Sequence, residues 1–168
     1  MTGTPGVGKT SLCTLLESQL PEDYGLAGFQ YVKLTDLITS KKLYKQWNEE
    51  FNVPEFDVDM VCDELEPLMS ERGGIILEFH SCDFFPERWF QLVVLLRCNN
   101  TQLYDRLKER GYTEKKITEN IECEILDVLK EEVEQSYNPD IVLELESTQV
   151  EHMQANMEAI VQRIRALV

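Results

Sequence analysis

The stretch Gly3-Thr4-Pro5-Gly6-Val7-Gly8-Lys9-Thr10 reads G-x-x-x-x-G-K-T, the pattern of a loop whose backbone N–H groups wrap the phosphates of a nucleotide. Glycines let the backbone approach an anion closely, and the helix expected from Lys9 onward points the positive end of its dipole at the same place. Lys9 would neutralise the β- and γ-phosphates, and the Thr10 hydroxyl would bind Mg²⁺. The alternative, a glycine-rich turn before an ordinary helix, is disfavoured because Leu12, Leu15 and Leu16 continue the pattern at helical spacing.

The residues before this loop depart from its usual context, which is strand, loop, helix. Only Met1 and Thr2 precede Gly3, fewer than an ordinary strand contains. We therefore expect the first strand to be missing or truncated.

Length and charge limit the classes of protein. A chain of 168 residues with 43% hydrophobic residues can form one compact domain over residues 1–168. The net charge of -15 disfavours non-specific binding to nucleic acids or to an anionic membrane, and it favours a basic protein partner.

The five cysteines are scattered and have neither C-x-x-C nor zinc-finger spacing. No apolar run near the start and no long apolar stretch indicates secretion or a membrane span. We expect reduced thiols and a location in the nucleus and cytoplasm.

The remaining chain alternates between strand and helix patterns. Apolar runs at 74–79 and 91–96 are typical of parallel strands covered on both faces, and further strands are expected at 29–34 and 140–145. Helices are expected from Lys9 to Pro21, over 57–69 with a kink at Pro67, through Leu103 and Leu107, over 117–133, and after a Thr148/Glu151 capping box. Residues 36–50 look weakly helical and form a candidate substrate flap. The pattern predicts a doubly wound α/β sheet with its ligand at the carboxyl ends of the strands.

Several side chains fit phosphoryl transfer, which needs positive charge and Mg²⁺ more than covalent chemistry. Glu78, at the end of an apolar strand, could reach Mg²⁺ through water, or it could be a solvated acid. Arg88 could grip a phosphate, and Arg106 and Arg110 share a helix face; for each arginine the alternative is a surface salt bridge. His80 could orient a water or a phosphate, or be a loop histidine with satisfied hydrogen bonds.

Aromatic residues and the second histidine are assigned structural positions. Tyr31, Trp47 and Trp89 are interpreted as core anchors rather than base-stacking platforms. His152 is expected on the surface.

Three stretches together resemble the adenylate kinase isoenzyme 6 family. They are the loop from Gly3 to Ser11, Cys82-Asp83-Phe84-Phe85-Pro86-Glu87-Arg88-Trp89, and Arg110-Gly111-Tyr112-Thr113-Glu114-Lys115-Lys116. The likeness runs from Gly3 to about Val142, and the second and third stretches are much more specific than the first.

The resemblance implies a mostly parallel P-loop kinase fold of the nucleoside monophosphate kinase type, with an NMP-binding segment at 33–56 and a short lid at 109–119. It implies a monomer that transfers phosphate from ATP to AMP with Mg²⁺, hydrolyses ATP, and assists small ribosomal subunit maturation by binding a basic ribosomal protein. When the family's binding residues are transferred to this sequence, the resemblance implies that ATP is held by Gly6, Gly8, Lys9, Thr10, Ser11 and Arg110. The catalytic set is Lys9, Glu78, His80, Arg88 and Arg106, with Mg²⁺ near Thr10 and Glu78.

Three features depart from the family pattern. The family has an apolar strand before the loop, commonly an arginine where this chain has Thr39, and usually an aspartate where it has Glu78. Thr39 weakens the expectation of tight AMP binding, and the longer Glu78 can still present a carboxylate to Mg²⁺-bound water.

Three hypotheses follow. The first is an adenylate kinase that uses Lys9, with arginines around the phosphoryl group. The second is an ATP-driven switch in ribosome assembly with incidental kinase activity. The third is a fragment that cannot fold without its first strand.

Overall fold

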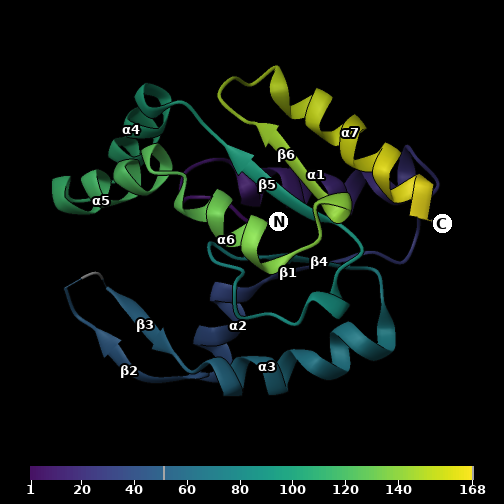
Figure 1. Ribbon diagram of the computed structural model, residues 1–168, viewed down its shortest axis with the longest axis horizontal. Coiled ribbons are helices and arrows are strands. Elements are labelled where there is room, and N and C mark those ends of the chain that lie inside the picture. The colour runs from purple at the N-terminus through teal and green to yellow at the C-terminus, as the bar shows by residue number, and fades with distance from the viewer. Residues whose placement is uncertain (51, 168) are drawn as a thin grey trace.

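The computed structural model describes residues 1–50 and 52–167 and has α/β architecture (Figure 1). Strands β1 (Gln30–Lys33) and β4 (Ile75–Glu78) pair in parallel, and so do β5 (Val93–Arg97) and β6 (Val142–Glu146). The strands β4 and β5 are the ones that the continuous apolar runs indicate, whereas β1 and β6 are only partly buried. The doubly wound parallel core is confirmed.

Met1 and Thr2 lie between these two pairs. The Met1 amino group donates to the Leu77 carbonyl at 2.9 Å, and the Phe79 N–H donates to the Met1 carbonyl at 3.1 Å. Thr2 forms a parallel bridge with Leu95 of β5. The chain therefore has the order β1, β4, Met1–Thr2, β5, β6, with two residues in the position of a central strand.

Helices cover both faces of this sheet (Figure 1). Their bounds are α1 (Lys9–Glu22), α2 (Leu34–Lys41), α3 (Val58–Pro67), α4 (Asn100–Glu109), α5 (Glu114–Ile125), α6 (Val128–Ser136) and α7 (His152–Leu167). A π-helical turn at Leu68–Arg72 follows Pro67, and 3-10 turns lie at Glu87–Trp89 and Pro139–Ile141. Pro21 lies inside α1, so the expected stop at that residue is wrong by one position.

The hydrophobic core consists of two clusters, one on each face of the sheet, because successive side chains of a strand point to opposite faces. Val94 and Leu96 of β5 belong to a buried cluster with residues of α1, α4 and α7. Val93 and Leu95 belong to a second cluster with residues of α2, α3 and α6. The result is a three-layer arrangement whose two cores meet at β5.

The expectation of a weak helix over residues 36–50 is confirmed for 36–41, which belong to α2, and is wrong for the residues after it. The helix α2 ends where Lys42 adopts a left-handed conformation with φ of 54°, and an antiparallel hairpin follows, formed by β2 (Tyr44–Asn48) and β3 (Val53–Phe56). Tyr44 and Trp47 stack edge to face, with ring centroids 6.0 Å apart. Aromatic and β-branched residues on both strands stabilise a hairpin by cross-strand pairing, which outweighs the weak helical pattern.

Two further helix expectations need correction. The single helix expected over 117–133 is split into α5 and α6 by Asp127, whose φ is 55°. The Thr148/Glu151 capping box does not form: α7 begins at His152, whose ring Nδ1 accepts hydrogen bonds from the N–H groups of Thr148 at 3.2 Å and Gln149 at 3.3 Å. No helix in residues 1–50 and 52–167 is both long and apolar enough to cross a membrane.

Candidate active site

The glycine-rich loop lies at the carboxyl ends of β4 and β5 and leads directly into α1. Gly8, with φ of 102°, is the residue before the helix, and a Cβ at Gly3 would lie 2.6 Å from the Leu96 carbonyl oxygen. Glycine is therefore required at both positions by backbone conformation and close approach. The first N–H groups of α1 have no partner within the helix, so they can bind an anion.

Lys9 lies beneath the loop with its side chain buried. Its Nζ donates to the carbonyls of Gly3 at 2.5 Å and Thr4 at 3.1 Å. Desolvation lowers the pKa of Lys9 from 10.5 to about 8, and the nearby charge of Arg110 also lowers it. A polyphosphate at the loop would meet a poorly solvated ammonium that two loop carbonyls hold beneath it.

Thr10 and Glu78 lie together, as the proposed Mg²⁺ site requires. The Thr10 hydroxyl donates to Glu78 Oε1 at 2.8 Å, and the Tyr31 hydroxyl donates to Oε2 of the same buried carboxylate. Desolvation and the bond to Glu78 raise the pKa of Tyr31, so it keeps its proton at neutral pH. Sequence reasoning assigned Tyr31 to the core and missed this contact.

The donor set at this point fits Mg²⁺. One carboxylate and one hydroxyl are hard oxygen ligands, and Mg²⁺ prefers few protein ligands, with waters and phosphate oxygens completing an octahedron. No group of three or more His, Cys, Asp or Glu side chains that could hold a metal occurs among the described residues. The residues present therefore suit an ion that arrives with a nucleotide better than a permanent all-protein metal site.

Arg106 joins the loop to the segment after β6. Its guanidinium donates to the carbonyls of Ser147 and Thr148, each at 2.8 Å, and reaches the Gly6 carbonyl at 3.5 Å. These bonds occupy the two terminal guanidinium nitrogens, which would otherwise be available to a phosphate. In this arrangement Arg106 positions the phosphate loop, while the exposed Arg110 lies at the end of α4 with its charge near Lys9.

Arg88 and His80 come from the segment after β4. Arg88 pairs with Glu66 of α3 at 2.7 Å, and the Trp89 ring N–H donates to the same carboxylate at 2.9 Å. His80 is exposed and its ring lies 4.2 Å from the Phe79 ring, centroid to centroid. Although the residue as a whole is exposed, neighbouring protein atoms desolvate the ring; this effect first, and the charge of Lys9 second, lower the pKa of His80 to about 4, so it is neutral at pH 7.

The expected NMP-binding segment at 33–56 corresponds to α2 and the β2–β3 hairpin, apart from Phe51, which lies outside the described residues. The expected lid at 109–119 spans the end of α4, Gly111 with φ of 74°, and the first half of α5. Glu50 of the hairpin and Lys115 of α5 form an ion pair, so the two segments are in contact. Thr39 uses its hydroxyl locally, donating to the Thr35 carbonyl at 2.9 Å.

A buried polar network behind the loop also escaped sequence reasoning. Glu124 of α5 accepts a hydrogen bond from the Thr4 hydroxyl at 2.6 Å and pairs with Arg97 at 2.7 Å. It also accepts from the Cys98 N–H at 3.2 Å. The phosphate loop is thereby tied to the helix that begins within the lid segment.

Comparison with known proteins identifies a matching family profile and several similar sequences. Residues 1–127 match a family profile described as "AAA domain". "Adenylate kinase isoenzyme 6 homolog" from Drosophila melanogaster is 46% identical over 86% of this chain and 78% of its own. The Caenorhabditis elegans homolog is 42% identical over 95% of this chain and 85% of its own. "Adenylate kinase isoenzyme 6 homolog FAP7" from Saccharomyces cerevisiae is 40% identical over 96% and 78%.

Solved structures support the fold. A shikimate kinase from Bacteroides thetaiotaomicron superposes with a TM-score of 0.62 at 14% identity, covering 98% of this chain and 95% of that one. A gluconokinase from Sinorhizobium meliloti gives 0.55 at 12%, covering 99% and 94%. Both are kinases, and at this identity the likeness concerns the fold.

Proposed function

Because the chain belongs to the adenylate kinase isoenzyme 6 family, and is therefore a nucleotide kinase-type enzyme, we propose that it transfers the γ-phosphoryl group of ATP to AMP and forms two ADP. The observation that carries the proposal is the buried Lys9 beneath the loop, beside the Thr10–Glu78 pair. Phosphoryl transfer needs positive charge at the β- and γ-phosphates, which Lys9 and a Mg²⁺ ion held at Thr10 and Glu78 would supply.

Each residue has a defined task in this reaction. The N–H groups of Gly6, Gly8, Lys9, Thr10 and Ser11 bind the phosphates, and Lys9 leaves the loop carbonyls to follow the charge on the γ-phosphate. The Thr10 hydroxyl and the Glu78 carboxylate would hold Mg²⁺ or its waters, and the ion would offset phosphate charge when it binds with ATP. Arg106 keeps the loop in place through the carbonyls of Ser147 and Thr148.

The acceptor nucleotide would lie between the hairpin and the phosphate loop. Arg88 leaves Glu66, an exposed pair that costs little to break, and binds the AMP phosphate. Arg110 approaches the phosphates as the segment at 109–119 closes about Gly111. Neutral His80 orients the phosphate or a water, the latter allowing ATP hydrolysis when AMP is absent.

The test of this function is the dependence of ADP formation on AMP. Purified protein with Mg²⁺-ATP is expected to form ADP several times faster when AMP is added, measured in a coupled assay that reports ADP. GMP serves as the matched acceptor, since it carries the same phosphate on another base. An unchanged rate with AMP would contradict the kinase proposal and leave an ATPase.

A second function is favoured by the net charge of -15 and by Thr39, which stands where the family commonly has an arginine. It is an ATP-driven switch that docks a basic small-subunit ribosomal protein during ribosome maturation in the nucleus and cytoplasm. This function predicts ATP hydrolysis without AMP that is stimulated by the basic partner. A pull-down in which no ribosomal protein binds in a nucleotide-dependent and salt-sensitive manner would contradict it.

ATP binding is expected to take up protons between about pH 8 and 10.5. In the free protein the pKa of Lys9 is lowered to about 8, against an ordinary value of 10.5. Above pH 8 the free amine therefore loses its proton, whereas bound phosphates favour the ammonium and restore it. Affinity for ATP should fall as the pH rises through this window.

Calorimetry of ATP binding at pH 9 in two buffers with different ionisation enthalpies measures this uptake directly. The Lys130→Met variant, which removes a partly exposed lysine on α6, should show the same uptake as the unmodified protein. Equal binding enthalpies in the two buffers would contradict the assignment of the proton to Lys9.

A further inference from the structure

The Tyr31 side chain lies on the same face of the sheet as Glu78. In the parallel pair of β1 and β4, Tyr31 lies opposite Ile76, and Lys33 lies opposite Glu78. Tyr31 is therefore diagonal to Glu78, at a distance of about 8 Å that follows from the strand spacing and the rise of two residues. Long side chains can bridge this distance, and the Tyr31 hydroxyl does so by donating to Glu78 Oε2.

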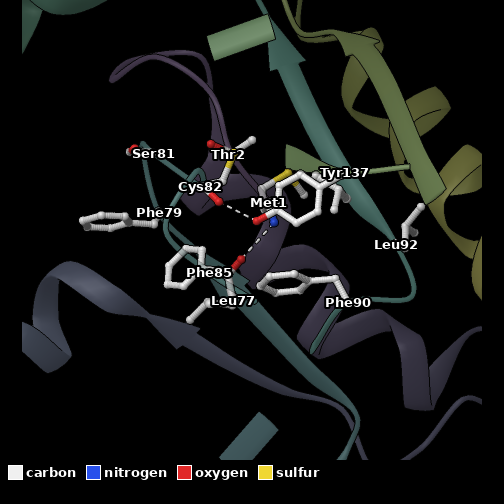
Figure 2. Close-up of a pocket in the computed structure, with 11 residues that line it drawn as sticks. Met1, Thr2, Leu77, Phe79, Ser81, Cys82, Phe85, Phe90, Leu92 and Tyr137 are labelled. Carbon is white, nitrogen blue, oxygen red and sulfur yellow. Dashed lines mark hydrogen bonds between the residues drawn. The ribbon is translucent and has the colours of Figure 1, made fainter. Parts of the chain in front are cut away.

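The backbone on both sides of this contact is held by other groups. The Tyr31 N–H donates to Glu17 of α1 at 2.8 Å. Leu77 and Phe79, the neighbours of Glu78, are buried in the second core cluster, and Figure 2 shows both among the residues that line the small pocket there. Because neighbouring strand residues point to opposite faces, the Glu78 side chain is directed away from that pocket. The freedom that remains is therefore in the Glu78 side chain itself.

Hydroxyl groups hold both oxygens of the buried Glu78 carboxylate. Oε1 accepts from Thr10 at 2.8 Å, Oε2 accepts from Tyr31, and the residue is 6% exposed. A carboxylate has about four acceptor positions, two on each oxygen. These two bonds use half of that capacity, so a metal ion or its waters can bind without displacing either hydroxyl.

The two hydroxyls differ in their other tasks. Thr10 lies in the first turn of α1 beside the phosphate loop, and its oxygen would itself bind Mg²⁺, so its contact with Glu78 depends on the state of the nucleotide site. Tyr31 belongs to β1, outside the phosphate loop. The bond from Tyr31 can therefore fix the Glu78 carboxylate both before and after the nucleotide binds.

The length of the Glu78 side chain makes such a bond necessary. A glutamate has one more rotatable bond than an aspartate, and ordering an additional rotor costs conformational entropy. An aspartate would hold its carboxylate nearer to the backbone of β4 with fewer rotamers. A glutamate is held as firmly only when another group fixes its outer end, as the Tyr31 hydroxyl does.

We propose that Tyr31 is a positioning residue for the Mg²⁺ site, whose hydroxyl holds the Glu78 carboxylate in the orientation that receives the ion together with Thr10. A group that orients a metal ligand removes the alternative positions of that ligand, so its loss weakens metal binding although it does not touch the metal. The inference rests on the Mg²⁺-ATP site of the proposed function, but AMP takes no part in it.

The experiment uses Tyr31→Phe, which removes the hydroxyl and keeps the ring. Calorimetry measures the affinity for the non-hydrolysable imido analogue of ATP, once in EDTA and once with excess Mg²⁺. Because Mg²⁺ binds the free analogue equally whichever variant is present, the ratio of the two affinities reports how tightly the complex holds the ion. Tyr31→Phe is expected to lower the affinity in Mg²⁺ by about tenfold, as loss of such an orienting group does, and to leave the affinity in EDTA unchanged.

Tyr24→Phe is the matched control. Tyr24 lies beyond the far end of α1, where its ring packs 5.6 Å from the guanidinium of Arg165. Loss of this hydroxyl should change neither affinity. Equal losses for Tyr31→Phe in EDTA and in Mg²⁺ would show that Tyr31 only supports the fold, and they would overturn the proposal.

Glu78→Asp provides a second arm, which stands even when Tyr31→Phe alone does not fold. The shorter side chain draws the carboxylate back from Tyr31, so adding Tyr31→Phe to Glu78→Asp should leave the ratio of affinities unchanged. A loss of the same size in the Glu78→Asp background would overturn the proposal.

The unmodified protein separates this inference from the proposed function. If its affinity for the analogue does not depend on Mg²⁺, the inference is wrong, while the coupled assay with AMP still decides the kinase proposal. If the protein binds the analogue neither in EDTA nor in Mg²⁺, both are wrong. A rate of ADP formation that AMP leaves unchanged, combined with the expected loss in Tyr31→Phe, contradicts only the acceptor.

Discussion

The Lys9→Met variant is expected to lose ADP formation from ATP and AMP by about a thousandfold or more. Methionine keeps much of the length of the side chain but removes the charge that follows the γ-phosphate. Loss of one preorganised charge at a transferring phosphoryl group corresponds to about 4 kcal/mol in the transition state. The coupled assay for ADP, under saturating ATP and AMP, measures the effect on kcat.

The folded state of the same variant should be no less stable than the unmodified protein. The lowered pKa of Lys9 reflects the cost of burying an ammonium, and that cost disappears with methionine. Thermal melting without nucleotide therefore separates a chemical defect from misfolding. The Lys130→Met variant is the matched control, because Lys130 of α6 is a partly exposed lysine that pairs with Glu144 of β6 at 3.1 Å. Retention by Lys9→Met of a tenth or more of the activity would contradict the assigned role.

The parts of the site that depend on local sequence could be predicted. A phosphate loop is a contiguous motif whose glycines, lysine and threonine each have a fixed task, so its geometry follows from a few neighbouring residues. Continuous apolar runs likewise identify β4 and β5, because buried parallel strands leave little room for polar side chains. Glu78 could be placed at the strand end for the same reason.

The parts of the site that depend on residues far apart in the sequence could not be predicted. Tyr31 reaches Glu78 only because β1 and β4 pair in parallel with Lys33 opposite Glu78, and no local pattern reports that register. Glu124 looks like one more acid on a charged helix until α5 packs against the phosphate loop. The prediction for the segment that forms the β2–β3 hairpin was wrong for another reason. The cross-strand contacts of the hairpin outweigh its weak helical propensity.

The arginines of the site could be predicted only in part. Sequence reasoning selected Arg88, Arg106 and Arg110 by residue type and spacing, and the structure places Arg106 against the loop and the charge of Arg110 near Lys9. It places Arg88 in an exposed pair with Glu66. Spacing on one helix therefore predicts a shared face, but it does not predict which carbonyls or acids that face meets.

Replacing Arg97 by methionine is expected to destabilise the fold by about 3 to 5 kcal/mol, the cost of leaving a buried charge without its partner. Glu124 is 4% exposed in its side chain, and the Arg97 Nε lies 2.7 Å from its Oε1. Without the guanidinium, the hydrogen bonds that the carboxylate keeps among the described residues are those from the Thr4 hydroxyl and the Cys98 N–H. The melting temperature should fall by roughly 10 °C, measured by calorimetry at pH 7.

The Glu124→Gln change distinguishes this explanation from a loss of packing around Arg97. Added to Arg97→Met, it removes the uncompensated charge while keeping an oxygen for Thr4, so the double variant should be more stable than Arg97→Met alone. Lys130→Met, which breaks an exposed pair, should cost less than about 1 kcal/mol. A double variant less stable than Arg97→Met would contradict the buried-charge argument. Because Glu124 holds Thr4 of the phosphate loop, Arg97→Met should also weaken ATP binding, and the Glu124→Gln double variant should restore part of that affinity.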